Sequence, residues 1–128
     1  MTCDPICAKL TTSVREVADL FIAESIRHLP IVEEGRLVGM VSDRDLRTIA
    51  GTYLNMPAEQ TVKPYPRVSD FCEAEVITAS PEDDIVNVID LMLYHHIGAV
   101  PIVDPRDQKL LGIVSYADVL RELRNAVA

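Results

Sequence analysis

The chain carries the stretch LPIVEEGRLVGMVSDRD at residues 29–45 and a similar stretch, VPIVDPRDQKLLGIVSYAD, at residues 100–118. In each stretch a short apolar run precedes a polar turn, and a second apolar run follows it. Two such runs separated by turn residues predict a β-hairpin. Each stretch then ends on Ser-x-x-Asp, which is typical of a helix start. The sequence therefore predicts two copies of a hairpin followed by a helix.

The similarity extends from these stretches to most of the chain. Residues 6–32 align with residues 77–103 at an offset of 71 without a gap, and a two-residue insertion then shifts the offset to 73. Fourteen aligned positions are identical, among them Pro30 and Pro101. Identities in the same order at a nearly fixed offset indicate an internal repeat.

An amphipathic helix is predicted before each hairpin. Val14, Val17 and Phe21 recur at helical spacing in the first copy. The second copy repeats the pattern with Ile85, Val88, Ile89 and Met92. Each copy therefore has an apolar helix face available for packing.

Polar residues mark where these two helices begin. Ser13 is followed by Glu16, which is the spacing of a capping box. In the second copy we expect the start at Ser80, with Pro81 and Asp83 in the first turn.

Each copy also begins with a short extended piece, near residues 6–8 and 76–79. The repeating unit is therefore β-α-β-β-α, and the fold class is α+β (α/β) with two tandem units. We expect the first repeat at 1–50, a connector at 51–68 that is rich in proline, and the second repeat at 69–128.

The composition excludes several function classes. Lys+Arg 12 against Asp+Glu 20 gives a net charge of -8, and the chain has no Trp and few other aromatic residues. Nucleic-acid binders usually carry a basic surface with stacking aromatics, so no nucleic-acid partner is expected. No apolar run approaches the length of a membrane span, and MTCDPICAKL at the start lacks the apolar core of a signal peptide. We expect no membrane association and a cytoplasmic protein, and the odd count of cysteines agrees with a reducing compartment.

The two copies resemble the CBS motif. Both contain an apolar residue followed by Pro-Ile-Val, and then Gly-hydrophobic-x-Ser-x-x-Asp at Gly39 to Asp45 and Gly112 to Asp118. The resemblance covers essentially the whole chain, in the tandem arrangement called a Bateman module. It implies CBS repeats that pack through their sheets with pseudo-two-fold symmetry. It also implies a regulatory module that needs no cofactor and binds AMP, ADP, ATP or S-adenosylmethionine as an effector in clefts between the repeats.

The resemblance assigns roles to residues that match the motif. Asp45 and Asp118 are expected to accept hydrogen bonds from ribose hydroxyls, and Ser42 and Ser115 to donate to a phosphate at the start of the following helix. These roles suit the chemistry, because carboxylates are acceptors and a helix start presents free N–H groups to an anion. The apolar slot and the backbone contacts for the base are expected from Cys7, Leu29, Pro30, Thr78, Ala99, Val100 and Pro101.

The two copies differ just before the predicted strand that contains the proline, Pro30 or Pro101. The first copy has Arg27 and His28 where the second has Gly98 and Ala99, and Arg44 adds a further cation. In nucleotide-binding relatives, basic residues at these positions contact phosphates, so we expect inequivalent clefts with the phosphate held by the first repeat. Alternatively, Arg27 and His28 are solvated residues at a helix end. Gly98 would permit close backbone approach in the other cleft.

Simpler interpretations remain beside these roles. Ser-x-x-Asp before a helix is also an ordinary capping arrangement, and the two roles can coexist. His95 and His96, together with Cys3, Cys7 and Cys72, match no tetrahedral metal spacing, and we interpret the cysteines as small buried residues. No nucleophile elbow, glycine-rich phosphate loop or zinc-protease signature is present, so we expect no enzyme activity.

The resemblance also implies a homodimer, a flat disc formed through apolar helix faces. We expect the faces that carry Val14, Phe21, Ile85 and Met92 to form it. Ligand occupancy would then pass across the dimer or to an effector protein. The alternative is a ligand-independent structural or dimerisation module whose clefts are empty.

Overall fold

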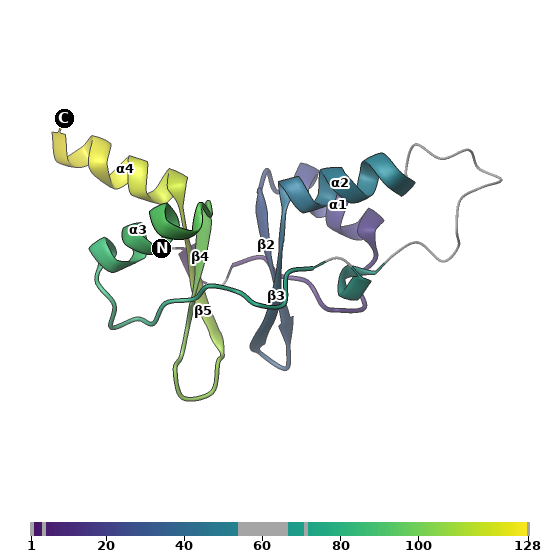
Figure 1. Cartoon of the computed structure of the whole chain (residues 1–128), viewed down its shortest axis with the longest axis horizontal. Coiled ribbons are helices and arrows are strands. Elements are labelled where there is room, and N and C mark those ends of the chain that lie inside the picture. The colour runs from purple at the N-terminus through teal and green to yellow at the C-terminus, as the bar shows by residue number, and fades with distance from the viewer. Residues whose placement is uncertain (1, 4, 54–66, 71, 128) are drawn as a thin grey trace. The chain divides into compact units, whose positions relative to one another are not determined.

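The computed structural model describes residues 2–3, 5–53, 67–70 and 72–127. Of the predicted connector 51–68, residues 54–66 lie outside the described residues. The elements in chain order are β1 (Thr2–Cys3), α1 (Val14–Ala23), β2 (His28–Glu33), β3 (Arg36–Ser42), α2 (Asp43–Tyr53), the 3-10 helix η2 (Val68–Asp70), α3 (Ile85–His95), β4 (Ala99–Val103), β5 (Leu110–Ser115) and α4 (Tyr116–Val127) (Figure 1).

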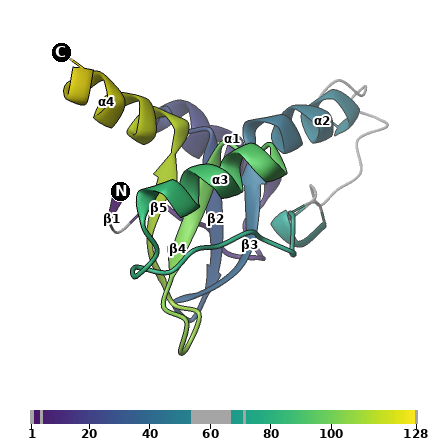
Figure 2. The ribbon, with the colours of Figure 1, turned by 60° about the vertical axis from the view of Figure 1, so that its left-hand side comes forward.

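The chain folds as two compact units. The first unit comprises Ile6–Glu33 and Val38–Val76, and the second comprises Met1–Pro5, Glu34–Leu37 and Ile77–Ala128. In the first unit, β2 and β3 form a two-stranded sheet, and α1 packs against α2. In the second unit the strand order is β1-β5-β4, α3 packs on β4 and α4 packs on β5. Figure 2 shows α3 lying across one face of the β4–β5 hairpin. The predicted hairpins and helices are thus confirmed.

Residues near the start of each repeat pair with the final strand of the other repeat. Thr2 and Cys3 pair antiparallel with Ile113 and Gly112 of β5. At the equivalent place in the first unit, Glu73 exchanges two backbone hydrogen bonds with Met40 of β3, each 3.0 Å long. As a result, each compact unit combines segments that are far apart in the sequence.

The apolar faces of α1 and α3 are mostly buried in the cores of their own units. Val14, Val17 and Phe21 of α1 lie in the core of the first unit, and Val88 and Met92 of α3 lie in that of the second. Helix faces with this pattern bury themselves against the nearest apolar sheet face. The prediction that these faces form a dimer contact is therefore wrong for three of its four residues. The exception is Ile85, which is 51% exposed.

One of the two predicted helix starts is wrong. The Ser13 hydroxyl accepts a hydrogen bond from the Glu16 N–H, as expected at the start of α1. In α3, however, the N-cap is Asp84, whose side chain accepts from the Asn87 N–H. Ser80 instead begins a tight turn that Asp83 closes by accepting from the Ser80 N–H at 2.8 Å.

Candidate ligand-binding site

The start of α2 carries a reciprocal capping box. The Asp45 carboxylate accepts from the Ser42 N–H at 3.0 Å, and the Ser42 hydroxyl accepts from the Asp45 N–H at 3.1 Å. The Asp43 N–H donates to the Arg27 carbonyl at 2.8 Å, which joins the chain before β2 to the helix start. These bonds hold a hydroxyl, a carboxylate and the residues just before β2 in one place. The capping interpretation is therefore confirmed for this copy.

The start of α4 repeats the arrangement in the second unit. The Asp118 carboxylate accepts from the Ser115 N–H at 2.9 Å, and the Ser115 hydroxyl accepts from the Asp118 N–H at 3.4 Å. The Tyr116 N–H donates to the Gly98 carbonyl at 3.0 Å, as Asp43 does to Arg27 in the first unit. The internal repeat thus extends to individual hydrogen bonds.

The two carboxylates differ in how many of their acceptor sites are occupied. Asp118 also accepts from the Ser115 hydroxyl at 3.2 Å, and its other oxygen pairs with Arg121 at 3.3 Å. In the part of the chain that the structure describes, Oδ1 of Asp45 and the hydroxyl proton of Ser42 have no such partner. A ligand hydroxyl would therefore meet an open acceptor at Asp45, whereas at Asp118 it would compete with a guanidinium.

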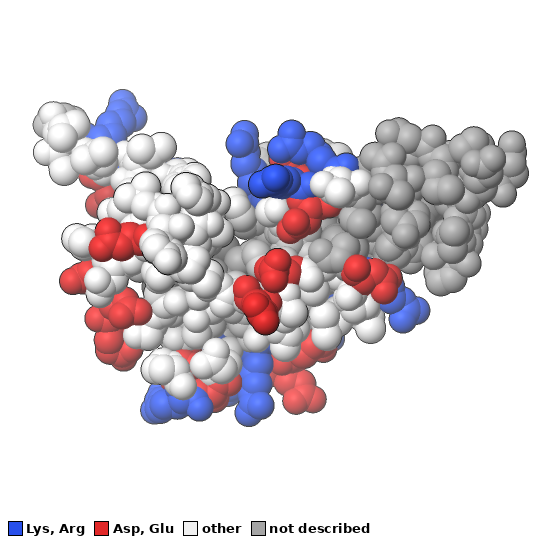
Figure 3. All heavy atoms as spheres, viewed as in Figure 1, with Lys and Arg blue, Asp and Glu red and all other residues white. Residues whose placement is uncertain are grey.

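Basic side chains accompany the site in the first unit. Arg27 and Arg44 are exposed, and Figure 3 shows Lys and Arg side chains gathering around α2. Burial lowers the pKa of His28 from 6.5, the charge of Arg27 lowers it further, and Asp43 and Asp45 oppose this shift. His28 is consequently mostly neutral at pH 7, and the positive charge at this helix start comes from the two arginines.

The predicted base slot involves residues with different surroundings. Leu29 and Val100 lie fully buried in the cores of their units. Because successive side chains of a strand alternate, Pro30 and Pro101 lie on the opposite strand faces, where they too are fully buried. Their carbonyls accept hydrogen bonds from Ala8 and from the equivalent alanine, Ala79, at 3.0 and 3.1 Å.

The remaining predicted slot residues, Cys7, Thr78 and Ala99, lie next to the residues that make these backbone hydrogen bonds. Cys7 precedes Ala8 and is exposed, so the prediction that it is buried is wrong, and Cys72 is half-buried. Thr78 precedes Ala79 and is half-buried, and Ala99 is buried at the start of β4. Both opening segments thus run beside the strand of their own unit, as the sequence indicated.

Arg121 was not among the predicted site residues. It pairs with Asp118 from one turn further along α4. The Asp-x-x-Arg spacing on a predicted helix is the sequence signal that indicates this pair. The first copy has Thr48 at the equivalent position, so the second copy alone has this pairing.

Two further features bear on function. Among the described residues, no group of three or more His, Cys, Asp and Glu side chains is placed to hold a metal ion. Over the same part of the chain, every helix is too short or too polar to cross a membrane.

Comparison with known proteins agrees with the repeat. The CBS domain family model matches residues 1–51 and 68–125. The chain is 31% identical over 125 residues to protein MJ1225 of Methanocaldococcus jannaschii. The aligned region covers 94% of this chain and 44% of the relative. It is 28% identical over 114 residues to the 5'-AMP-activated protein kinase subunit gamma-3 of Homo sapiens, covering 88% of this chain and 23% of the relative. The chain thus spans less than half the length of these relatives.

A solved structure matches over nearly the whole chain. It is the CBS domain pair of protein MJ0100 in complex with 5'-methylthioadenosine and S-adenosyl-L-methionine. The TM-score is 0.83 at 28% identity, with 98% of this chain and 93% of the other covered. Together with the family match to both repeats, this similarity shows that the chain belongs to the CBS domain family.

Proposed function

We propose that this chain is a regulatory CBS module that senses an adenosine-containing metabolite. The observation that carries the proposal is the start of α2, where Asp45 has an open carboxylate oxygen, Ser42 has a free hydroxyl proton, and the Asp43 N–H holds the backbone of the exposed Arg27 at the same helix end. The similarity to a CBS pair solved with 5'-methylthioadenosine and S-adenosyl-L-methionine supports the adenosine part of the ligand.

Each residue at this helix start has a role that its chemistry suits. Asp45 accepts hydrogen bonds from the ribose hydroxyls through the oxygen that the capping box leaves open. Ser42 donates its hydroxyl proton to a phosphate, which the positive end of α2 also favours. Arg27 and Arg44 supply charge for the phosphate from exposed positions. The apolar strand residues and the segments around Cys7 and Thr78 hold the base.

The two arginines favour a phosphorylated ligand at the first repeat, which means AMP, ADP or ATP rather than S-adenosylmethionine. S-adenosylmethionine carries a sulfonium cation, so a site with two guanidinium groups disfavours it. In the second repeat Arg121 competes for the Asp118 carboxylate, and no arginine stands at the positions of Arg27 and Arg44. We therefore propose one stronger and one weaker nucleotide site.

Calorimetric titration with AMP, ADP, ATP, adenosine and S-adenosylmethionine tests this function. The nucleotides are expected to bind more tightly than adenosine, and Arg27→Ala is expected to reduce nucleotide affinity while leaving adenosine affinity unchanged. Arg15→Ala removes an arginine from α1 and is the matched control. If none of the five compounds binds, the chain is instead a ligand-independent structural module, and the sensor proposal is wrong.

We also propose a homodimer, formed through α4 rather than through the faces first predicted. No residue of α4 is buried, and Tyr116, Leu120, Leu123 and Val127 are between 48% and 76% exposed. Their spacing of four, three and four residues is that of a helix that pairs with another helix. Light scattering after size exclusion is expected to give a dimer for the native chain and a monomer for Leu120→Ala with Leu123→Ala. The control Ile22→Ala, which changes an exposed apolar residue of α1, leaves the dimer intact. A native chain that is monomeric would contradict this assembly.

A further inference from the structure

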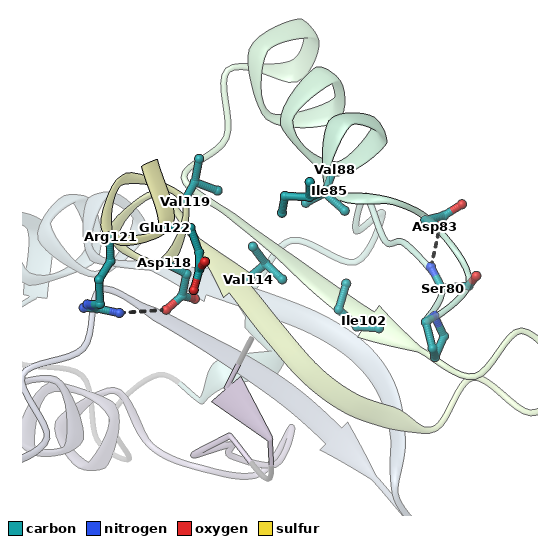
Figure 4. Close-up of a pocket in the computed structure, with 11 residues that line it drawn as sticks. Ser80, Asp83, Ile85, Val88, Ile102, Val114, Asp118, Val119, Arg121 and Glu122 are labelled. Atoms are coloured by element: carbon teal, nitrogen blue, oxygen red, sulfur yellow. Dashed lines mark hydrogen bonds and ion pairs between the residues drawn. The ribbon is translucent and has the colours of Figure 1, made fainter. Parts of the chain in front are cut away.

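A groove lies between α3 and α4 in the second unit (Figure 4). Its volume is about 480 Å³, which is within the range of small-molecule sites. The apolar part of its lining is formed by Ile85, Val88, Ile102, Val114 and Val119, and most of the remaining lining side chains are polar or charged. All of these residues belong to one compact unit, so the groove does not depend on the other unit.

Smaller or more polar side chains than those of the first repeat open this groove. In the first unit, α1 packs against α2, and Phe21 and Leu46 are buried there. The offsets of the repeat place the smaller Val119 at the position of Leu46 and Glu122 at the position of Ile49. Because Leu46 is buried, its replacement by the smaller Val119 reduces the apolar volume at this place in the second unit.

The groove leaves apolar surface in contact with water. Ile85 is 51% exposed, whereas the equivalent Val14 of the first unit is 0% exposed. Covering such surface is favourable, and an apolar ligand body can do so. The first repeat achieves the same result with its own side chains.

The rim of the groove carries uncompensated negative charge. Arg121 pairs with Asp118, so these two charges offset each other. The Glu122 carboxylate has no hydrogen bond or ion pair with any residue in the described part of the chain, and Asp83 holds only a backbone N–H within its own turn. Figure 4 shows Glu122 and Asp83 on opposite sides of the apolar floor.

We propose that this groove binds a small organic cation, an amine with an aromatic or aliphatic body. The body covers the apolar floor, and the ammonium group lies at the rim near Glu122 or Asp83. This ligand differs in charge from the nucleotide proposed above, and the groove is separate from the stronger nucleotide site at the start of α2, although it shares Asp118 with the weaker one. On α4, Asp118, Arg121 and Glu122 lie on the side opposite the exposed apolar stripe, and Val119 borders the stripe, so we expect a dimer through the stripe to leave the charged rim of the groove open.

Chemical-shift perturbation in two-dimensional NMR with 2-phenylethylamine tests the site. The amide signals of Ile85, Val88, Val119 and Glu122 are expected to move, and those of Ser42 and Asp45 to stay. Phenylacetate and 2-phenylethanol have the same body without the positive charge, and we expect the alcohol to bind about fivefold more weakly, with the acid weaker still. Equal affinities for the three compounds would refute the charge assignment.

Two variants separate charge from shape. Glu122→Gln keeps the size of the side chain, so it is expected to reduce amine affinity about threefold and to leave alcohol affinity unchanged. Val119→Leu with Glu122→Ile restores the residues of the first repeat, fills the groove and is expected to abolish binding of all three compounds. If the filled variant does not fold, Val119→Leu alone provides the steric test. Binding that persists in a folded, filled variant would overturn the proposal.

The same samples distinguish this site from the nucleotide site. In AMP titration the filled variant is expected to keep the stronger nucleotide site of the native chain, because neither substitution alters the start of α2. If the native chain does not bind AMP, the proposed nucleotide function is wrong, whereas the groove proposal still stands. The amine could shift the NMR signals of the groove only in the monomeric double variant, Leu120→Ala with Leu123→Ala, and not in the native chain. This result would show that a second copy covers the groove, and it would overturn the proposal.

Discussion

Replacing Asp45 separates the capping role of this residue from its proposed role in binding. Asp45→Ala removes the acceptor for the Ser42 N–H, which lies 3.0 Å away, and loss of such a cap costs about 1 kcal/mol of unfolding free energy. The same change removes a charged acceptor for two ribose hydroxyls. Hydrogen bonds to charged groups are each worth about 1.5 kcal/mol or more, so AMP affinity should fall by about 3 kcal/mol, or about a hundredfold in Kd.

Asp45→Asn is the matched variant. The amide oxygen of asparagine still accepts from the Ser42 N–H, so the stability of the fold should change by less than about 0.5 kcal/mol. The amide NH2 then stands where the open oxygen of Asp45 was, so the ribose hydroxyls lose both the charge and their acceptor, and AMP should weaken nearly as much as in Asp45→Ala. Calorimetric titration measures the affinities, and urea unfolding measures the stabilities. If Asp45→Ala remains folded and binds AMP within a factor of two of the native chain, the ribose role is refuted.

Three further predictions follow from burial, capping and titration. Leu29→Ala should cost about 2 to 5 kcal/mol in urea unfolding because Leu29 is 0% exposed, whereas Ile22→Ala at 80% exposure should cost less than about 0.5 kcal/mol. Asp84→Ala should destabilise α3 by about 1 kcal/mol and Ser80→Ala by less, and equal effects in thermal unfolding would contradict the assignment of Asp84 as the cap. Because the folded-state pKa of His28 is lowered below 6.5, the unfolded chain binds more protons, so stability should fall as the pH drops below about 7. His28→Gln should flatten this dependence between pH 7.5 and 5.5, and an unchanged slope would show that His28 does not cause it.

The repeat made most of the fold predictable from the sequence. Helix and hairpin positions in one copy supported those in the other, because aligned residues such as Val17 and Val88 occupy equivalent core positions. The start of α3 was missed because Ser80, Pro81 and Asp83 form a local turn that resembles a cap. The alignment itself contained the correct answer, since Asp84 lies at the position of Ser13.

Other features depend on packing that a sequence pattern does not encode. An apolar stripe such as Val14 and Phe21 looks the same whether it covers its own sheet or a partner, and only the burial in the structure decides between them. The two-residue strand Thr2–Cys3 is too short to show any periodicity. The Ser-x-x-Asp motifs were identifiable, but the unequal use of Asp45 and Asp118 depends on side-chain geometry around Arg121.

The pairing of β1 with β5 has a consequence for how the protein is made. Thr2 is synthesised about 110 residues before its partner Ile113. The second unit therefore cannot complete its sheet until β5 has emerged, and the edge of β5 is unpaired until β1 joins it. A nascent chain that stalls before β5 lacks the partner for Thr2 and Cys3, so during this interval wrong intermolecular pairing competes with folding.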